Sequence, residues 1–383
     1  MDFGFSAEDE RFRDEVREWL GVHAPGAAGR REWEQTLGKD GWVGIGWGEA
    51  GYGNRTASLT QQVVWAEEYA RSVAPPRSGH IGENLLAPTL LAHGTDEQKA
   101  RFLPAVAAGE ELWCQGYSEP GAGSDLAGIR TKAERAPDGT YRISGQKIWT
   151  SLAHEADWCF VLARTEPGSA RHRGLSFLLV PMDQPGRVEV RPIRQLTGTS
   201  DFNEVFFDGA CARAEHVVGG AGAGWQVAMS LLGFERGVST LAQQIGFAAE
   251  LGRVVDAAVR SGAVTDPVLR QRLVRQWAEL RAMRWNALRT LGSPGDAGAP
   301  SAAKLLWAGW HQRLGELAME VRGAAAAAGP VDWSPSAPYE LDAAQHLFLF
   351  SRADTIYGGS DQVQRTIIAE RVLGLPREPK GVV

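Results

Sequence analysis

The chain has few cysteines, no long apolar run and no excess of positive charge. Its 383 residues include three cysteines, Cys114, Cys159 and Cys211, an odd and dispersed set that is typical of reduced core thiols in a cytoplasmic protein. No apolar stretch approaches the roughly 20 residues of a membrane span, so none is predicted. Forty basic against 46 acidic residues give a net charge of −6, which argues against a nucleic-acid partner. The acidic start at residues 1–10 is unlike a secretory signal.

Several signatures of catalysis are also missing. The eight histidines and three cysteines show no metal-ligand spacing, so no metal site is predicted. No Gly-x-Ser-x-Gly segment suggests a hydrolase nucleophile. The loop Gly121-Ala122-Gly123-Ser124 is glycine-rich, but a β-prone segment follows it where a dinucleotide fingerprint needs a helix. Taken alone, these four residues fit a turn between strands better than a phosphate-binding loop.

The patterns that are present divide the chain into three regions. Helical periodicity and a capping-box spacing from Thr95 predict a helical domain over residues 1–110. Short β-prone segments separated by Gly, Pro and Asp predict an antiparallel, barrel-like β domain over residues 111–222. Runs rich in Ala, Leu, Arg and Glu then predict a C-terminal four-helix bundle over residues 223–383. The predicted fold class is therefore α+β with three domains.

Three longer strings carry a family resemblance. They are Tyr117–Asp125 (YSEPGAGSD), Gln146–Ser151 (QKIWTS) and Ile356–Gly374 (IYGGSDQVQRTIIAERVLG). In this order and separation they resemble the acyl-CoA dehydrogenase family of flavoproteins, and the resemblance covers essentially the whole chain. It implies an FAD-dependent oxidoreductase of lipid metabolism that desaturates an acyl thioester, carried by CoA or by a carrier protein. It also implies an electron-transfer flavoprotein as the electron acceptor.

The resemblance assigns cofactor-binding roles to individual residues. In the β domain, Ser118 is expected to hydrogen-bond the flavin ring, Trp149 to pack against the ring, and Ser151 to lie close to flavin N5. Near the C-terminus, Ser360 and Gln362 match FAD-contacting positions. For Trp149 the alternative is an ordinary core tryptophan, since the chain has 14.

Substrate contacts follow from the same comparison. Ser124 matches a residue that contacts the pantetheine arm of CoA, and Tyr357 is expected beside the substrate. Arg171 and Arg173 lie in a charged loop between two β-prone segments. Arginine forks match phosphate oxygens, so these two side chains are candidates for gripping the CoA phosphates. A merely solvated loop is the alternative for them.

The most informative absence is a glutamate after Tyr357. Many relatives carry their catalytic base there, whereas this chain has Gly358, which cannot take a proton but keeps the backbone N–H implied to bind the thioester oxygen. Glu235 lies in a helical pattern among mostly apolar neighbours, where burial makes a carboxylate a better base, with Arg236 available to moderate the effect. Position alone favours an ion pair inside the bundle. A subset of the family, however, places its base in a Glu-Arg pair of this kind, so we expect Glu235 to be the base.

Two departures from the family bear on assembly. Residues 260–267 lack the Arg-x-x-Phe element of homotetrameric members, and Arg322-Gly323 is followed by five alanines instead of a Gln- and Gly-rich segment. Both elements normally touch the FAD of a neighbouring subunit. We therefore expect a homo- or hetero-tetramer, including an α2β2 form in which a different chain completes the flavin site. Two other functions stay open: a flavin-dependent monooxygenase or oxidase on this fold, and a non-catalytic subunit of a heteromer.

Overall fold

The computed structural model describes residues 4–26, 29–48, 51–234, 239–291, 298–328 and 340–377. The chain divides into two compact units. The first unit is Phe5–Gln195 with Ser200–Gly237, and the second is Val238–Val383 with the short segments Met1–Gly4 and Leu196–Thr199.

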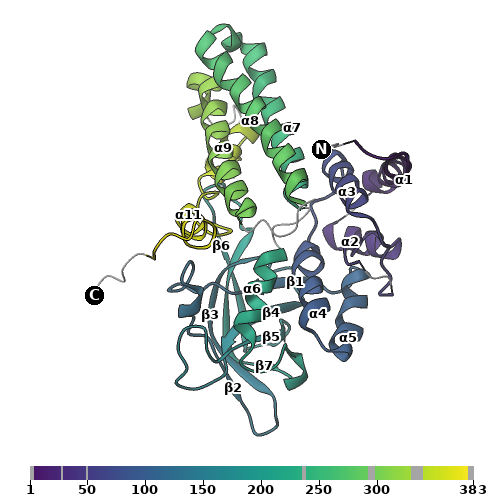
Figure 1. Ribbon diagram of the computed structural model, residues 1–383, viewed down its shortest axis with the longest axis vertical. Coiled ribbons are helices and arrows are strands. Elements are labelled where there is room, and N and C mark those ends of the chain that lie inside the picture. The colour runs from purple at the N-terminus through teal and green to yellow at the C-terminus, as the bar shows by residue number, and fades with distance from the viewer. Residues whose placement is uncertain are drawn as a thin grey trace. The chain divides into compact units, whose positions relative to one another are not determined.

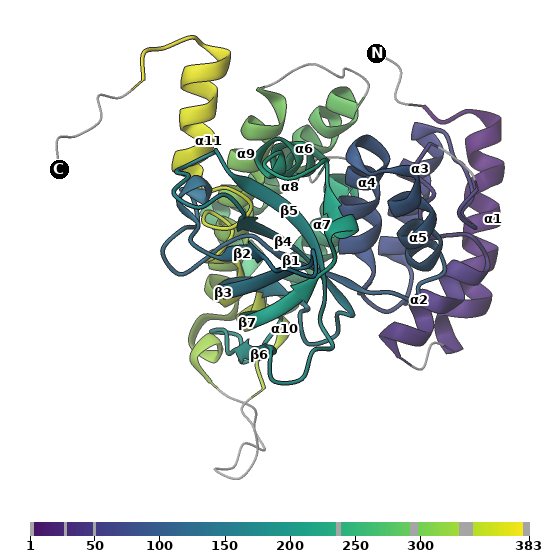
Figure 2. The same cartoon turned by 90° about the horizontal axis from the view of Figure 1, so that it is seen from below.

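Helices open the first unit. They are α1 (Ala7–His23), α2 (Arg30–Lys39), α3 (Leu59–Arg71), α4 (Ala87–His93) and α5 (Asp96–Ala107) (Figures 1 and 2). Complete capping boxes begin α1 at Ser6, α3 at Ser58 and α5 at Thr95, as expected for Ser or Thr placed three residues before an acidic or amide side chain. An aromatic core joins α1, α2 and α3, in which the rings of Trp42 and Trp65 stack with centroids 4.6 Å apart. The predicted N-terminal helical domain is confirmed.

A single sheet of eight strands follows within the described residues. The strands are β1 (Trp113–Gly116), β2 (Lys132–Arg135), β3 (Tyr141–Ser151), β4 (Trp158–Arg164), β5 (Leu175–Pro181), β6 (Val188–Ile193), β7 (Phe202–Ala212) and β8 (Val217–Val218). The order is β6-β7-β3-β2-β4-β5-β8, and β1 pairs with β4 beside this path. The sequence predicted antiparallel pairing, and most neighbours are antiparallel. Two pairs, however, are parallel: β2 with β4, and the short β1 with β4, which sets Cys114 opposite Cys159. All three cysteines are free thiols.

Both faces of the central strands are covered. In β5 every residue from Leu175 to Val180 is buried, so apolar side chains point to both sides of the sheet. One face, with Phe160 and Phe177, packs on α4, α5 and α6 (Gly224–Phe234), and Figure 1 shows α6 lying across the strands. The other face, with Val161 and Leu178, packs against side chains from β3 and β7. The helices therefore cover one side of the β domain and fix its strands in a shared core.

The second unit is a helical bundle. Its helices are α7 (Ser239–Ser261), α8 (Pro267–Leu291), α9 (Ala299–Arg322), α10 (Ala343–Ser351) and α11 (Asp361–Ile367). Figure 1 shows α7, α8 and α9 side by side, and apolar residues of α7 to α10 such as Phe247, Leu273, Trp310 and Leu347 form one core. The predicted α+β class with helical terminal domains and a β middle domain is confirmed. Among the described residues no helix is long and apolar enough to cross a bilayer, and no group of histidine, cysteine or acidic residues could hold a metal.

Gly224, at the start of α6, allows that helix to approach the sheet. A Cβ at this position would lie 2.5 Å from the backbone carbonyl carbon of Ser176 in β5. Strand backbone cannot yield easily, so Gly224→Ala is expected to destabilise the protein by about 1–3 kcal/mol. Urea unfolding measures the effect. In the matched variant Gly233→Ala, on the same helix, the new methyl meets nothing within 4 Å, and stability should stay equal or rise by about 0.5–1 kcal/mol.

Candidate active site

The structure brings two of the three family-like strings side by side in the first unit. The backbone N–H of Ile148 in β3 donates to the carbonyl oxygen of Ser118, with an N···O distance of 3.0 Å. The ammonium of Lys147 donates to the carbonyl oxygens of Tyr117 (3.0 Å) and Leu162 (2.9 Å) and to Oε1 of Glu119 (2.9 Å). The segment that carries Ser118 is therefore tied to the segment that carries Trp149 and Ser151.

Lys147 and Glu119 form a buried ion pair. Lys147 is fully buried and Glu119 is 8% exposed. The Glu119 carboxylate also accepts hydrogen bonds from the backbone N–H groups of Arg130 (2.6 Å) and Thr131 (2.9 Å). Burial alone would raise the pKa of Glu119, but the Lys147 ammonium and these hydrogen bonds more than offset burial and hold that pKa below its usual value. Burial lowers the pKa of Lys147, and Glu119 offsets only part of that effect.

Trp149 projects from an irregularity in β3. The pairing of β3 with β7 slips between Lys147 and Thr150, and Trp149 at that point has a φ of 61°, in the left-handed region that tryptophan rarely adopts. Its side chain is 57% exposed and its indole meets the ring of Phe202 edge-on, with centroids 6.3 Å apart. Strained backbone that presents a large exposed ring is typical of a ligand-binding position. The alternative of an ordinary core tryptophan does not apply to Trp149.

The polar groups near Trp149 fit a flavin. Ser118 and Ser151 are half-buried, and within the described residues neither hydroxyl has a protein partner. A flavin ring needs a flat surface to pack on and hydrogen-bonding groups near its heteroatoms. The exposed indole of Trp149 and these two hydroxyls supply both kinds of group from the first unit alone.

The glycine-rich loop and the charged loop also meet in the first unit. Ser124 is exposed on the loop after β1, and its neighbour Asp125 accepts a hydrogen bond from the Arg171 guanidinium at 3.3 Å. Arg171 has a φ of 54°, and the guanidinium of Arg164 donates to the backbone carbonyl oxygens of Arg171 (3.1 Å) and Arg173 (2.9 Å). The loop backbone is thus held by Arg164 while both arginine side chains stay exposed. An exposed ion pair such as Arg171–Asp125 holds little energy and can exchange for a phosphate.

The tail residues lie in the second unit. Gly358 and Gly359 have φ values of 62° and 83°, both in the left-handed region. The Gln364 amide donates to the carbonyl oxygens of Gly358 (3.3 Å) and Gly359 (3.2 Å). The backbone N–H of Gly358, in contrast, has no acceptor among the described residues. The Tyr357 hydroxyl donates to Oδ1 of Asp354 at 2.8 Å.

Two further predicted residues lie just beyond this turn. Ser360 is the N-cap of α11, and its hydroxyl oxygen accepts from the Val363 N–H at 3.4 Å, which leaves its own proton available to a ligand. Gln362 is exposed in the first turn of α11. Glu235 and Arg236 lie outside the described residues, after the end of α6 at Phe234, so their expected roles stay predictions.

Two clusters were missed by reasoning from sequence. One is the Lys147–Glu119 pair, which a lysine at an inward-facing position of an alternating strand could have signalled. The other joins Glu250 of α7, His311 of α9 and Asp354. These three residues share no local spacing, so no short-range pattern could have found them.

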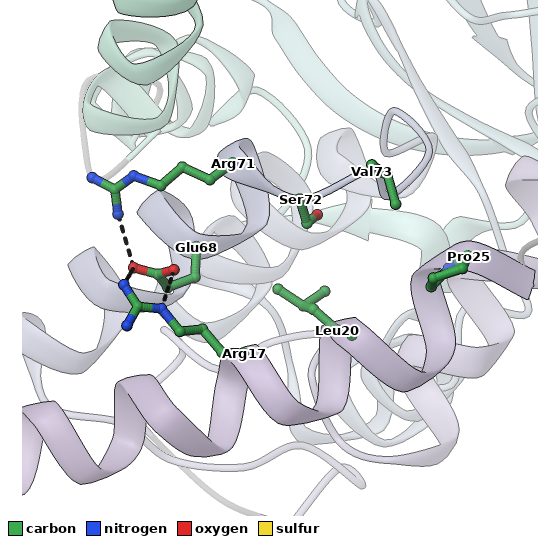
Figure 3. Close-up of a pocket in the computed structure, with 8 residues that line it drawn as sticks. Arg17, Leu20, Pro25, Glu68, Arg71, Ser72 and Val73 are labelled. Carbon is green, nitrogen blue, oxygen red and sulfur yellow. Dashed lines mark hydrogen bonds and ion pairs between the residues drawn. The ribbon is translucent and has the colours of Figure 1, made fainter.

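A pocket between α1 and α3 does not resemble a phosphate or cofactor site. It has a volume of about 260 Å³ and is lined in part by Arg17, Glu68 and Arg71. Figure 3 shows both guanidinium groups turned toward Glu68, whose oxygens they reach at 2.8 Å each. Arg71 also lies 3.5 Å from Oε2 of Glu67, so two carboxylates balance the two guanidinium groups and little positive charge is left for an anionic ligand.

Comparisons with known proteins agree with this architecture. Three family models match: acyl-CoA dehydrogenase N-terminal domain over residues 6–110, middle domain over 114–210 and C-terminal domain over 222–373. The acyl-CoA dehydrogenase IpdE1 of Mycobacterium tuberculosis is 54% identical over 391 residues, covering 97% of this chain and 99% of its own. IpdE1 of Mycolicibacterium smegmatis is 52% identical, with 98% and 100% covered.

Solved structures agree as well. The ChsE4–ChsE5 complex from Mycobacterium tuberculosis is similar with a TM-score of 0.83 and 31% identity, covering 99% of this chain and 100% of that one. The steroid ACAD Tcur3481–Tcur3483 gives a TM-score of 0.84 and 30% identity, with 99% and 100% covered. The fold and the three matched domains define the class of protein, with helical N- and C-terminal domains and a β middle domain. The chain belongs to the acyl-CoA dehydrogenase family, and it is an oxidoreductase with acyl-CoA dehydrogenase function.

Lys147→Met tests the ion pair under the predicted flavin platform. The substitution leaves the Glu119 carboxylate buried without its cation, which is expected to cost about 3–5 kcal/mol in unfolding free energy. Urea unfolding checks this, and Lys132→Met on the exposed side of β2 serves as the control. Adding Glu119→Gln to Lys147→Met should recover part of the loss. Equal stability of the two single lysine variants would show that the pair is not a stabilising element.

Gly358→Ala tests the left-handed turn. The new Cβ would lie 3.7 Å from Cε of Lys304, an ordinary contact, so the expected cost of about 1–2 kcal/mol comes from the backbone alone. The backbone N–H is retained, so activity should stay within about tenfold of wild type. Gly252→Ala in α7, where φ is not positive and the methyl meets nothing within 4 Å, is the control for chemical denaturation. No difference in stability between the two variants would contradict the strain.

Proposed function

We propose that the protein is an FAD-dependent dehydrogenase that introduces an α,β double bond into an acyl thioester, with Glu235 as the base. One observation carries the proposal: the residue after Tyr357 is a glycine whose backbone N–H has no acceptor among the described residues. A glycine there cannot remove a proton but can donate a hydrogen bond. The turn at Gly358 therefore suits the thioester oxygen, and the base has to come from another segment.

The cofactor-binding residues keep the roles that the resemblance implies. When bound, FAD supplies the acceptor for the hydride that leaves the β carbon. Ser118, Trp149 and Ser151 hold the flavin ring, the first and last by hydrogen bonds and Trp149 by packing. Ser360 and Gln362 contact the remainder of FAD. The exposed indole of Trp149 on strained backbone supports this assignment, because strained backbone is concentrated at ligand-binding sites.

Glu235 removes the α proton. That proton is only weakly acidic, so its removal needs a carboxylate in a dry site and a hydrogen-bond donor for the charge that develops on the thioester oxygen. The backbone N–H of Gly358 supplies that donor. Arg236 moderates the effect of burial on the pKa of Glu235 and contacts the substrate. Tyr357 lies beside the acyl chain.

The substrate is a CoA or carrier-protein thioester with a bulky acyl group. Ser124 contacts the pantetheine arm, and Arg171 and Arg173 bind the phosphates. Their exposed side chains, on a loop whose backbone Arg164 holds by hydrogen bonds, support this role. A glycine at 358 leaves room beside the reacting carbons, and the description of Tcur3481–Tcur3483 as a steroid ACAD supports a cyclic acyl group. An electron-transfer flavoprotein accepts the electrons.

The assembly is a tetramer with a second kind of subunit. The chain lacks the two elements with which homotetrameric relatives reach a neighbour's FAD, and the similar ChsE4–ChsE5 structure is a complex of two chains. A partner chain then completes the flavin site. Within this chain, the proposed domain boundaries lie near residues 110 and 222. The proposed location is the cytoplasm, whose reducing conditions suit the three free cysteines.

Anaerobic reduction of the flavin tests the reaction and the base together. The flavin-loaded protein is mixed with straight-chain, branched and polycyclic acyl-CoA thioesters, and loss of the visible flavin band is followed. Glu235→Gln should slow the reduction about 10²- to 10⁴-fold, because the proton acceptor is lost while thioester binding remains.

Glu110→Gln, an exposed position before β1, is the control and should reduce at the wild-type rate. Persistent colour with every thioester in a protein that carries FAD would contradict the dehydrogenase function. Equal rates for Glu235→Gln and wild type would leave the dehydrogenase reaction supported but would contradict the role of Glu235 as the base. A chain that purifies without FAD and regains it only with a second subunit would support the heteromer.

A further inference from the structure

A histidine is held between two carboxylates inside the second unit. His311 of α9 has a side chain that is 6% exposed. Its Nδ1 lies 2.6 Å from Oδ2 of Asp354, and its Nε2 lies 2.8 Å from Oε2 of Glu250 in α7. A neutral imidazole has one N–H, so only the imidazolium can donate to both carboxylates. Burial alone would lower the pKa of His311, but Asp354 and Glu250 together raise it to about 9.

Asp354 is the point at which this pair meets the tail. It is completely buried, and its carboxylate accepts from both His311 and the Tyr357 hydroxyl. Its backbone carbonyl oxygen accepts from the ammonium of Lys304. That ammonium also lies over the rings of Trp307 and Tyr357, 4.0 Å and 4.7 Å from their centroids. Asp354 is thus bound through its side chain and its backbone, and it binds the tyrosine that precedes Gly358.

The turn after Asp354 has further backbone attachments. The N–H groups of Ile356 and Tyr357 both donate to the Ala353 carbonyl oxygen, at 2.8 Å and 3.1 Å. The Asp361 N–H donates to the Thr355 carbonyl oxygen at 3.0 Å, and Gln364 holds the carbonyl oxygens of Gly358 and Gly359. None of these hydrogen bonds involves the carbonyl oxygen of Tyr357 or the N–H of Gly358 among the described residues. The plane of that peptide is therefore set by the residues that flank it, and Tyr357 is tied to Asp354. Two consecutive glycines add freedom of rotation, so an external fixing group is needed to keep the N–H in one direction.

The surroundings of His311 contain few other charges. Glu250 of α7, Asp354 and Tyr357 of the turn, and Lys304 of the same helix face this cluster. His346 of α10 lines the same cavity, about 320 Å³ in volume, without an ion pair to these groups among the described residues. One imidazolium therefore bridges two anions that would otherwise repel each other across the cavity.

We propose that His311 is a positioning residue: by bridging Glu250 and Asp354, it fixes the Asp354–Gly359 turn and thereby the direction of the Gly358 N–H. This role rests on the proposed function, in which that N–H donates to the thioester oxygen. His311 itself touches no reacting atom. Its contribution is to keep a glycine-rich turn in the geometry that the transition state needs, where a displacement of about 1 Å costs up to about 10²-fold in rate.

His311→Gln in the flavin-loaded protein, with its partner subunit if one is needed, tests the role in catalysis. Glutamine keeps hydrogen-bonding ability but cannot carry the charge. The kcat for the best acyl-CoA of the panel should fall about 10- to 100-fold, while KM changes less than about threefold, because the misplaced N–H weakens a bond made mainly in the transition state. Flavin content should be unchanged. His346→Gln, in the same cavity, is the control and should keep wild-type kcat.

A readout without cofactor or substrate separates this proposal from the proposed function. Amide hydrogen exchange of the peptide spanning Asp354 to Asp361 is compared between the wild type and His311→Gln. At pH 6.5, exchange in the variant should be at least about tenfold faster, since local opening is easier without the bridge. The stabilising effect of the charged His311 is complete below its unfolded pKa of 6.5 and is lost as the pH rises through about 9. The difference between the two proteins should therefore nearly vanish by pH 10.

Lys304 also titrates in this pH range. Burial lowers its pKa to about 8, but because Lys304 is present in both proteins, its titration cancels in the comparison. Equal exchange at pH 6.5, or a difference that does not depend on pH, would overturn the positioning role. A wild-type kcat in His311→Gln would also overturn it. A wild type that dehydrogenates no thioester while the pH-dependent exchange difference remains would reject the proposed function and keep the bridge.

Discussion

The buried ammonium of Lys147 is the interaction on which the part of the first unit that carries Ser118 and Trp149 depends. It has three N–H donors and three acceptors, the carbonyl oxygens of Tyr117 and Leu162 and the carboxylate of Glu119, so no donor is left unsatisfied. A buried ion pair is by itself weak evidence of stability, because desolvation offsets much of the attraction. Its value here is in geometry. The loop after β1, the edge of β3 and the strand β4 meet at one nitrogen atom, which sets Ser118 against the segment that presents Trp149.

The second unit uses a buried cation in a related way but with a group that titrates. Lys147 keeps three hydrogen-bond acceptors although burial lowers its pKa, and its strand is further held by ladder hydrogen bonds to β2 and β7. The turn at Gly358 has no ladder, and its two glycines resist ordering because glycine loses the most backbone entropy on folding. Charge-assisted hydrogen bonds from His311 and Lys304 to Asp354 compensate for this. The segment of β3 is therefore held by ladder hydrogen bonds and a buried lysine, whereas the glycine turn is held by charge-assisted hydrogen bonds to Asp354.

Local patterns of the sequence predicted the elements but not their long-range pairing. Ser6, Ser58 and Thr95 are visible as caps because a capping box acts over four residues. The parallel pairing of β1 with β4 joins residues more than 40 positions apart, and a strand of four residues carries no signal of its partner. The strained φ of Trp149 arises from a slip between two strands, so its exposure could not be inferred from its residue type. The family resemblance named Trp149, Ser118 and Gly358, whereas His311, Glu250 and Asp354 lie 61 and 43 positions apart and show no common motif.

In the proposed function, a glycine at 358 and a base in another segment are physically connected. At a φ of 62° any residue with a Cβ is strained by about 1–2 kcal/mol, so a glutamate there would have to be held in place by the remainder of the turn. Its carboxylate would also start close to Lys304, whose ammonium lies 4.0 Å from the position of a Cβ, and such a cation makes a carboxylate a weaker base. With glycine, the Lys304 ammonium binds the Asp354 carbonyl oxygen, and in the proposed function the turn serves only to direct an N–H. In the proposed function, moving the base to Glu235 separates proton removal from charge stabilisation, so the electrostatics of each group can be set without weakening the other.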